Sequence, residues 1–183
     1  MRIVGITGTL GAGKGTVVDY LVQHCGFRHY SVRGYLREEA ERRQLTNINR
    51  DTFTAIANEL RALHSPSFIA DELYRQAAAN GQDAIIESIR TPGEVAALKA
   101  KGDFILLAVD ADPKIRYERV VLRGSETDRI SFENFLADEK REMSNQDPNK
   151  QNLAACIAQA DFCLKNNGDY EALFAQIEDI FNK

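Results

Sequence analysis

The chain has 183 residues, 44% of them hydrophobic and 27% charged, which is typical of one globular domain with a full core. Its formal net charge of −4 argues against a general binder of nucleic-acid polymers or membrane surfaces. Residues 1–3 lead into the first predicted strand and no apolar run approaches a membrane span, so we expect a cytoplasmic protein with a single domain over 1–183. No obligatory protein partner is indicated.

The first predicted element is a strand over residues 3–6, followed by a glycine-rich turn and a helix near Lys14. Four residues separate Gly8 from Gly13, and Lys14 follows, as in a phosphate-binding loop (P-loop). Small residues let consecutive backbone N–H groups surround a polyphosphate, and the lysine adds a mobile positive charge. The sequence therefore predicts binding of a nucleoside triphosphate. The predicted binding residues are Gly8, Gly11, Ala12, Gly13, Lys14, Gly15 and Thr16.

One position departs from the usual P-loop pattern. A Ser or Thr normally follows the lysine and binds Mg²⁺ through its hydroxyl, whereas here Gly15 follows Lys14 and Thr16 comes next. This Gly-Lys-Gly-Thr variant resembles that of the adenylate-kinase-like nucleoside monophosphate kinases. The resemblance spans nearly the whole chain and implies ATP and Mg²⁺ as cofactors, with Thr16 as a metal ligand.

The elements that follow alternate between strand and helix. Further strands are predicted at 27–31, 84–86, 104–109 and 162–164. Helices are predicted at 32–43, 52–63, 68–79, 132–143, 153–160 and 170–181, with two more starting at 92 and 113, whereas 46–51 is polar and predicted to be irregular. The alternation predicts a three-layer α/β/α fold with a five-stranded parallel sheet, which binds ligands at the carboxyl ends of its strands. By the resemblance, residues 33–64 form an acceptor-binding insertion and 124–143 a short lid.

The segment after the second strand resembles the family's Ser-x-Gly-Asp-x-Leu-Arg sequence. Its serine, leucine and arginine match at Ser31, Leu36 and Arg37, and the resemblance implies that Arg37 binds the acceptor phosphate. Arg33 replaces the glycine and is a further candidate. The alternative for Arg37 is an exposed charge paired with Glu41 one helical turn away.

The segment Glu87-Ser88-Ile89-Arg90 follows the third strand and resembles the family's Asp-Gly-x-x-Arg or Asp-Gly-x-Arg sequence. The resemblance implies that Glu87 lies near the metal and phosphates, with its extra methylene allowing contact through water, and that Arg90 binds acceptor phosphate. A planar guanidinium at a strand end suits a phosphate. A simple ion pair with Lys14 or Arg90 is the alternative role for Glu87.

Arg116, Arg119 and Arg123 share a helical face after the fourth strand, and no acid lies within helical reach of Arg119. The resemblance places Arg119 over the adenine and phosphates of the donor and Arg123 at the lid hinge. The resemblance further implies Arg129 in the lid, Arg141 on the return helix as a residue that binds the acceptor substrate, and Asn167 and Gly168 beside the donor base. The alternatives are a solvated basic face and an ordinary Asn-Gly turn.

So many arginines around one P-loop favour phosphoryl transfer between two phosphorylated molecules. The predicted reaction is ATP-dependent phosphorylation of a nucleoside or deoxynucleoside monophosphate. Dephospho-coenzyme A kinases instead phosphorylate a hydroxyl and typically carry an acid at the end of strand two, where this chain has Ser31 to Arg33. Glu87 could still serve as the base for a hydroxyl acceptor, so that alternative stays open. A non-catalytic nucleotide-binding module or an ATPase is the third alternative.

Overall fold

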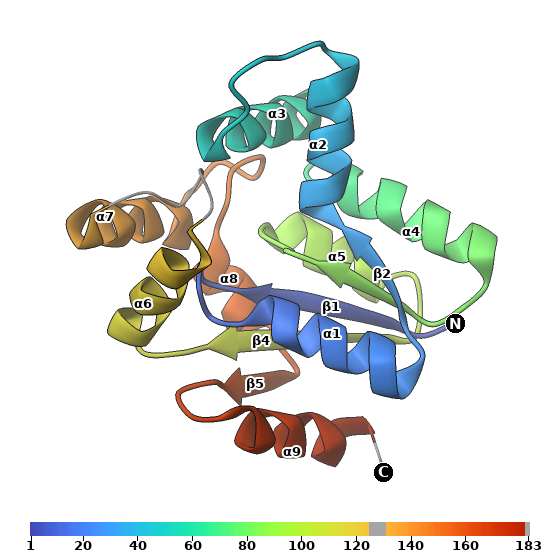
Figure 1. Ribbon diagram of the computed structural model, residues 1–183. Helices are drawn as coiled ribbons and strands as arrows, with labels where there is room; N and C mark the ends of the chain where they lie inside the picture. Colours follow the sequence, from blue (N-terminus) through green and yellow to red (C-terminus); the bar gives the residue numbers. More distant parts are fainter. Residues whose placement is uncertain (125–130, 182–183) are drawn as a thin grey trace.

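The computed structural model describes residues 1–124 and 131–181, and its centre is a five-stranded sheet (Figure 1). The strands are β1 (Ile3–Gly8), β2 (Arg28–Ser31), β3 (Ala84–Glu87), β4 (Phe104–Asp110) and β5 (Phe162–Lys165). Their order is β2-β3-β1-β4-β5, and all four pairings are parallel. The parallel sheet expected from the sequence is thus confirmed, and every strand ends at the same edge.

Helices cover both faces of this sheet, because each central strand is apolar on both sides. In β1, Val4 and Ile6 face α1 (Lys14–Cys25) and α9 (Tyr170–Phe181). Ile3 packs in a second core with α4 (Phe68–Asn80), α5 (Pro92–Lys99) and α8 (Leu153–Ala158). The architecture has three layers, α/β/α, as predicted. No helix within residues 1–124 and 131–181 is long and apolar enough to cross a membrane.

Four further helices stand around the carboxyl edge of the sheet: α2 (Val32–Arg42), α3 (Arg50–Leu63), α6 (Pro113–Arg123) and α7 (Phe132–Met143). α2 and α3 pack against each other and rise above this edge, opposite α6 and α7 (Figure 1). Helices α2 and α3 contain the residues predicted as an insertion at 33–64, and α7 contains most of the residues predicted as a lid at 124–143. Residues 125–130 of that lid lie outside the described residues.

The prediction that 46–51 is irregular is wrong for its last two residues, because α3 starts at Arg50. The Asn49 side chain accepts a hydrogen bond from the backbone N–H of Thr52 at 2.9 Å, and the Thr52 hydroxyl accepts one from the N–H of Asn49 at 3.3 Å. Such reciprocal capping satisfies two donors that a helix start leaves free. It places Arg50 in the first turn of α3.

Candidate functional site

The glycine-rich loop between β1 and α1 is shaped by positions that admit no side chain. Gly13 has φ +98°, and a Cβ there would lie 2.1 Å from Nδ2 of Asn166. At Gly8, with φ +134°, a Cβ would lie 2.2 Å from the carbonyl oxygen of Val109. Asn166 also donates to the carbonyl of Ala12 at 2.8 Å. The loop is therefore held by the ends of β4 and β5 with its backbone available to a ligand.

The other predicted residues of this loop continue it into α1. Gly11 also has positive φ, Ala12 is fully buried, and Gly15 and Thr16 form the first turn of α1. The hydroxyl of Thr9 is buried without a hydrogen-bond partner among the described residues. A buried hydroxyl is normally satisfied, so this donor suits an oxygen of a bound phosphate.

Lys14 folds back over the loop that precedes it. Its ammonium donates to the carbonyls of Gly8 at 3.0 Å and Thr9 at 2.9 Å. Loss of hydration and the positive charge of Arg90 lower the pKa of Lys14 to about 7, against a smaller opposing effect from Glu87 and Glu142. A polyphosphate beside this group would restore its charge and give it better acceptors than backbone carbonyls.

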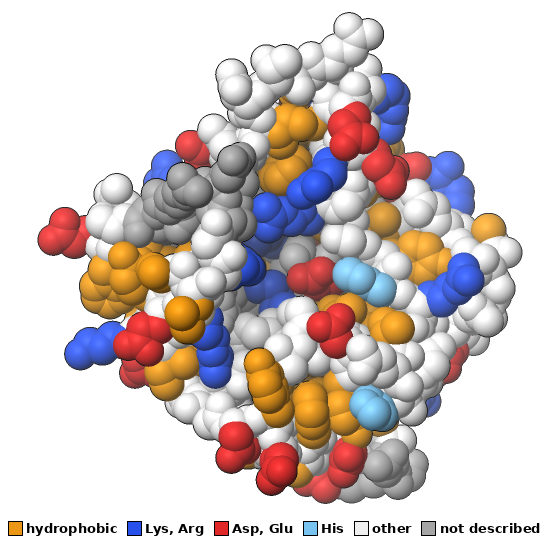
Figure 2. Space-filling model, in the orientation of Figure 1, with side chains coloured by type: hydrophobic (Ala, Val, Ile, Leu, Met, Phe, Trp, Pro, Cys, Tyr) orange, Lys and Arg blue, Asp and Glu red, His pale blue; other side chains and the backbone are white. Residues whose placement is uncertain are grey.

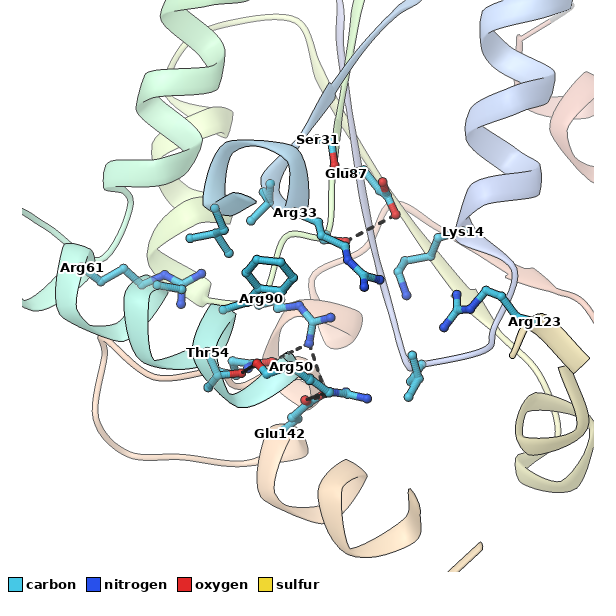
Figure 3. Close-up of a pocket in the computed structure, with 17 residues that line it drawn as sticks. Lys14, Ser31, Arg33, Arg50, Thr54, Arg61, Glu87, Arg90, Arg123 and Glu142 are labelled. Atoms are coloured by element: carbon cyan, nitrogen blue, oxygen red, sulfur yellow. Dashed lines mark hydrogen bonds and ion pairs between the residues drawn. The ribbon is translucent and has the colours of Figure 1, made fainter. Parts of the chain in front are cut away.

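A cavity opens beside Lys14, between the P-loop and the helices at the carboxyl edge (Figure 3). Its lining residues are Leu10, Lys14, Ser31, Val32, Arg33, Leu36, Arg50, Phe53, Thr54, Ala57, Arg61, Glu87, Ser88, Arg90, Arg123, Glu142 and Gln151. Figure 2 shows the corresponding hollow, in which Lys and Arg side chains gather. The excess of cations makes this cavity suitable for an anionic ligand.

Glu87 lies at the end of β3, within the cavity. Its carboxylate is 3.1 Å from Nε2 of His29 and accepts a bond from the Ser88 hydroxyl at 3.4 Å. Burial raises the pKa of Glu87, but the His29 bond, the charge of Lys14 and the Ser88 bond together outweigh it and hold that pKa below its usual value. Glu87 is therefore a carboxylate at neutral pH.

Ser88 has φ +69°, a left-handed conformation that L-residues adopt at a cost. We expect Ser88→Gly to be more stable than Ser88→Ala by about 1 kcal/mol, since both lose the hydroxyl but only glycine relieves the strain. Chemical denaturation of the two variants measures this difference. Equal stability, or a more stable alanine variant, would show that the backbone at this position is not strained.

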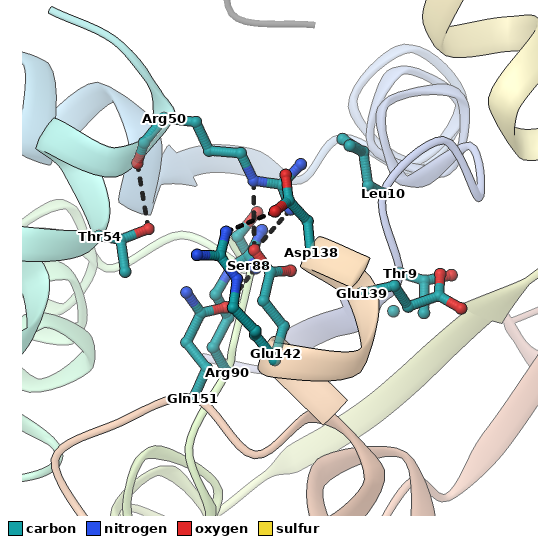
Figure 4. Close-up of polar contacts among 12 residues, drawn as sticks. Thr9, Leu10, Arg50, Thr54, Ser88, Arg90, Asp138, Glu139, Glu142 and Gln151 are labelled. Carbon is teal, nitrogen blue, oxygen red and sulfur yellow. Dashed lines mark hydrogen bonds and ion pairs between the residues drawn. The ribbon is translucent and has the colours of Figure 1, made fainter. Parts of the chain in front are cut away.

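Arg90 belongs to a cluster that joins three distant parts of the chain (Figure 4). Its Nη1 donates to Glu142 Oε2 at 3.1 Å and to Gln151 Oε1 at 2.5 Å, while Arg50 from α3 donates to Glu142 Oε1 at 2.6 Å. Burial raises the pKa of Glu142, yet the two arginines hold it below its usual value. One carboxylate thus holds two guanidinium groups side by side.

Sequence reasoning identified Arg90 but missed Arg50, Glu142 and Gln151 as its partners. These residues lie 40, 52 and 61 positions from Arg90, so no local pattern joins them. The capping pair Asn49–Thr52 was the available signal for Arg50, because it places that arginine in the first turn of α3.

The remaining predicted arginines differ in whether they line the cavity. Arg33 and Arg123 are exposed residues that line the cavity, and the Arg33 guanidinium lies 5.6 Å from the centre of the Phe53 ring. Arg37 is exposed on α2 and is not among the lining residues. Arg141 is exposed and pairs with Asp138 beside a second, neighbouring pocket. Arg129 lies outside the described residues.

Arg116 and Arg119 point toward the P-loop side of α6. Arg116 is buried and bonds to the carbonyls of Ala111 and Leu10 at 2.8 and 3.3 Å and to Glu139 of α7, so it supports the loop. Nη2 of Arg119 is 3.5 Å from Asn166 Oδ1, and its buried Nη1 has no partner in the described part of the chain. Arg119 therefore has a donor to offer a ligand of the P-loop.

Two predicted residues of the donor-base loop follow β5. Asn167 accepts a hydrogen bond from the backbone N–H of Asp112 at 2.7 Å, which joins the loop to the start of α6. Gly168 is exposed. The loop directly follows buried Asn166, which donates to the P-loop carbonyl of Ala12, and so lies beside the P-loop.

The predicted Mg²⁺ ligands, Thr16 and Glu87, lie on α1 and at the end of β3. Among the described residues no group of three or more His, Cys, Asp or Glu side chains could hold a metal ion. Mg²⁺ in phosphoryl-transfer sites keeps several waters and binds one or two protein oxygens together with substrate phosphates. The hydroxyl of Thr16 and the ionised Glu87 are donors of that kind.

Comparisons with known proteins agree with this fold. A family model described as an AAA domain matches residues 4–146. A UPF0200 protein of Pyrobaculum aerophilum is 31% identical over 167 residues, covering 91% of this chain and 88% of that protein. One of Methanococcus maripaludis is 28% identical over 186 aligned positions, covering 100% of this chain and 97% of that protein.

Solved structures show the same fold at low sequence identity. A putative kinase from Chloroflexus aurantiacus has a TM-score of 0.62 at 16% identity, and shikimate kinase from Aquifex aeolicus has 0.54 at 13%. Each comparison covers 99% of this chain and 96% of the other. The chain belongs to the AAA-domain family and, like the UPF0200 proteins that it resembles, to the P-loop proteins with a kinase-like fold.

Proposed function

We propose that the protein transfers the γ-phosphoryl group of ATP to a nucleoside or deoxynucleoside monophosphate. The observation that carries this proposal is one cavity with cationic groups at two separate positions. Lys14 and the P-loop backbone lie on one side, and the Arg50–Glu142–Arg90 cluster lies on the other (Figure 3). A simple nucleotide-binding module would need only the first.

On the donor side, the P-loop and Lys14 would hold the phosphates of ATP. The unpaired Thr9 hydroxyl and Arg119 Nη1 are further donors beside this loop. We assign Arg123 and Arg129 to neutralising charge on the transferred group, and Asn167 and Gly168 to the adenine. Mg²⁺, with Thr16 and Glu87 as its ligands, would neutralise phosphate charge when bound.

On the acceptor side, Arg90 would hold the phosphate of the monophosphate together with Arg50. Nη1 of Arg50 is buried and has no hydrogen-bond partner within residues 1–124 and 131–181, so it has a donor to offer. Arg33 lines the same cavity and would contribute charge. The predicted roles of Arg37 and Arg141 in acceptor binding require these exposed side chains to turn toward the cavity.

In the reaction, an oxygen of the acceptor phosphate bonds to the γ-phosphorus, the bond from that phosphorus to the bridging oxygen breaks, and ADP leaves. An ionised phosphate carries no proton that must be removed, so the step needs no general base. The protein contributes alignment and neutralisation of charge, which is what phosphoryl transfer chiefly requires.

The position of Glu87 favours a second candidate function, phosphorylation of a hydroxyl. Glu87 lines the cavity as a carboxylate, so it is placed to accept the proton of a hydroxyl acceptor there, but its lowered pKa makes it a weaker base than an ordinary glutamate. In that reaction Glu87 would take the hydroxyl proton as the oxygen bonds to the γ-phosphorus. This is the chemistry expected from the resemblance to dephospho-coenzyme A kinases.

An acceptor screen tests these proposals. ADP formation is measured with ATP and Mg²⁺ alone, then with each nucleoside and deoxynucleoside monophosphate, and with hydroxyl acceptors that include dephospho-coenzyme A and shikimate. We expect one monophosphate to raise the rate by roughly a hundredfold or more, because it replaces water as the aligned acceptor. Lys14→Met, purified identically, controls for contaminating kinases. ADP formation independent of every acceptor would indicate an ATPase, and phosphate on a hydroxyl would favour the second candidate.

A further inference from the structure

The cavity has a second part, distant from the P-loop, where α3 and α2 supply apolar walls. Phe53, Ala57 and Arg61 follow one another at four-residue intervals and so share a face of α3. Val32 and Leu36 of α2 line the same cavity and belong to one buried cluster with Phe53 and Ala57. Arg61 lies across the cavity from Lys14 and Arg123 (Figure 3).

Arg61 has an unusual environment for an arginine, with only 1% of its surface exposed. Its Nε and Nη2 donate to Oε1 of Glu94 at 3.1 and 2.8 Å, and Glu94 is itself fully buried. Nη1 of Arg61 is also buried and has no hydrogen-bond partner in the part of the chain that the structure describes. A buried donor without a partner is costly, and Arg61 lines the cavity, so a ligand bound there would satisfy this donor.

The charge of Arg61 is already balanced, which restricts the chemistry of that ligand. One oxygen of Glu94 faces the guanidinium, and the other accepts the backbone N–H groups of Arg90 at 2.8 Å and Thr91 at 3.0 Å. A second anion at Arg61 would lie beside the Glu94 carboxylate and be repelled. The unpaired N–H therefore suits a neutral acceptor, and arginine can only donate.

We infer that Arg61 reads an exocyclic carbonyl oxygen on the ring of the acceptor, while the apolar walls contact the ring. The inference rests on the proposed function and names its substrate class: monophosphates of bases that carry a carbonyl, namely uracil, thymine, cytosine, guanine or hypoxanthine. Adenine carries an amino group and no carbonyl, and its acceptor nitrogens lie within the rings and do not project from them as an exocyclic oxygen does. Adenosine monophosphate (AMP) is therefore the disfavoured acceptor.

The test compares kcat/KM for AMP with that for the monophosphates of uridine, thymidine, cytidine, guanosine and inosine. Inosine monophosphate differs from AMP only by a carbonyl in place of the amino group and by a proton on the adjacent ring nitrogen, N1. We expect the best carbonyl-bearing monophosphate to exceed AMP by about tenfold to a hundredfold, the range for a hydrogen bond from a charged donor.

Substitutions at Arg61 test whether this residue causes the preference for carbonyl-bearing monophosphates over AMP. A single neutral substitution would leave Glu94 charged and buried, and could unfold the protein. R61M/E94Q removes both charges and keeps an oxygen at position 94 for the two N–H groups, while Arg61→Lys keeps the charge but loses the fork of donors. Arg75→Met, an exposed arginine paired with Glu72 on α4, is the matched control.

In both Arg61 variants the preference over AMP should fall to within about threefold, whereas Arg75→Met should retain it. Thermal unfolding and the KM for ATP show that the variants are folded. A wild-type protein that prefers AMP, or folded variants that keep the carbonyl preference, would overturn the inference while leaving the proposed function intact. If no monophosphate is phosphorylated and none binds in calorimetry, the proposed function fails and this inference fails with it.

Discussion

Replacing Lys14 with methionine is expected to lower kcat for phosphoryl transfer by about 10³-fold or more. The Lys14 ammonium donates to two carbonyl oxygens of the P-loop within 3.0 Å. In the reaction it would neutralise the negative charge that develops on the transferred phosphoryl group. Methionine retains most of the side-chain volume but no charge. The measurement is kcat at saturating ATP and acceptor, with Lys101→Met on the opposite edge of the sheet as control. A loss of less than tenfold would contradict a catalytic role.

Because the pKa of Lys14 is about 7, protonation of this group on ligand binding can be measured near neutral pH. Above pH 7 the free protein holds this group largely neutral, and a polyphosphate favours its charged form. ATP binding at pH 8 should therefore take up about one proton, and uptake should decline toward pH 6 because Lys14 is already protonated there. Calorimetry in buffers of different ionisation enthalpy counts that proton. Lys14→Met should lose the uptake while Lys101→Met keeps it.

The same pKa predicts how the stability of the free protein depends on pH. Folding lowers the pKa of Lys14 from 10.5 to about 7. Below pH 7 Lys14 is charged and desolvated in the folded state, which lowers the free energy of unfolding. This destabilisation decreases as the pH rises from 7 toward 10.5, where the lysine also becomes neutral in the unfolded state. Lys14→Met should thus be more stable than the wild type near pH 6, by a margin that shrinks at higher pH. Urea denaturation at several pH values measures this. A destabilised variant at pH 6 would mean that Lys14 is well solvated.

The P-loop could be predicted from sequence because its constraints are local. Gly8 and Gly13 need positive φ and leave no room for a Cβ, and their spacing from Lys14 is fixed by one turn of backbone. The parallel sheet followed from apolar strands that alternate with helices. In each case the information lies within a few adjacent residues.

The rest of the candidate site could be predicted only in part, because its contacts are between distant segments. Arg119 has no acid within helical reach, which suggested a ligand-binding face for the helix, but Arg116 on the same helix is paired with Glu139 of α7, 23 residues away. Arg37 was selected by resemblance, yet the buried face of α2 is formed by Leu36 and Ala40, and Arg37 lies outside that face and is exposed. Arg61 and Glu94 lie 33 residues apart and carry no local sign of pairing.

Replacing Arg90 with methionine is expected to weaken acceptor binding by roughly a hundredfold, the effect of losing charged hydrogen bonds to a phosphate. ATP binding at pH 6, where Lys14 is charged with or without Arg90, should change by less than about threefold, since Arg90 lies in the cavity beyond the P-loop. The Kd values of the best monophosphate and of its parent nucleoside separate phosphate contacts from ring contacts. In the wild type the monophosphate should bind much more tightly, and in Arg90→Met the two should become similar. Arg2→Met, an exposed arginine paired with Asp103, is the control.

The double variant R90M/E142Q distinguishes lost attraction from new repulsion. In Arg90→Met, Glu142 keeps its charge with Arg50 as its remaining arginine partner in the cluster, and this carboxylate would repel an incoming phosphate. Neutralising Glu142 removes that repulsion, so the double variant should bind the monophosphate more tightly than the single variant but more weakly than the wild type. Equal weakening of ATP and monophosphate binding in Arg90→Met would count against an acceptor site at this cluster. It would then indicate that the cluster supports the fold around the P-loop.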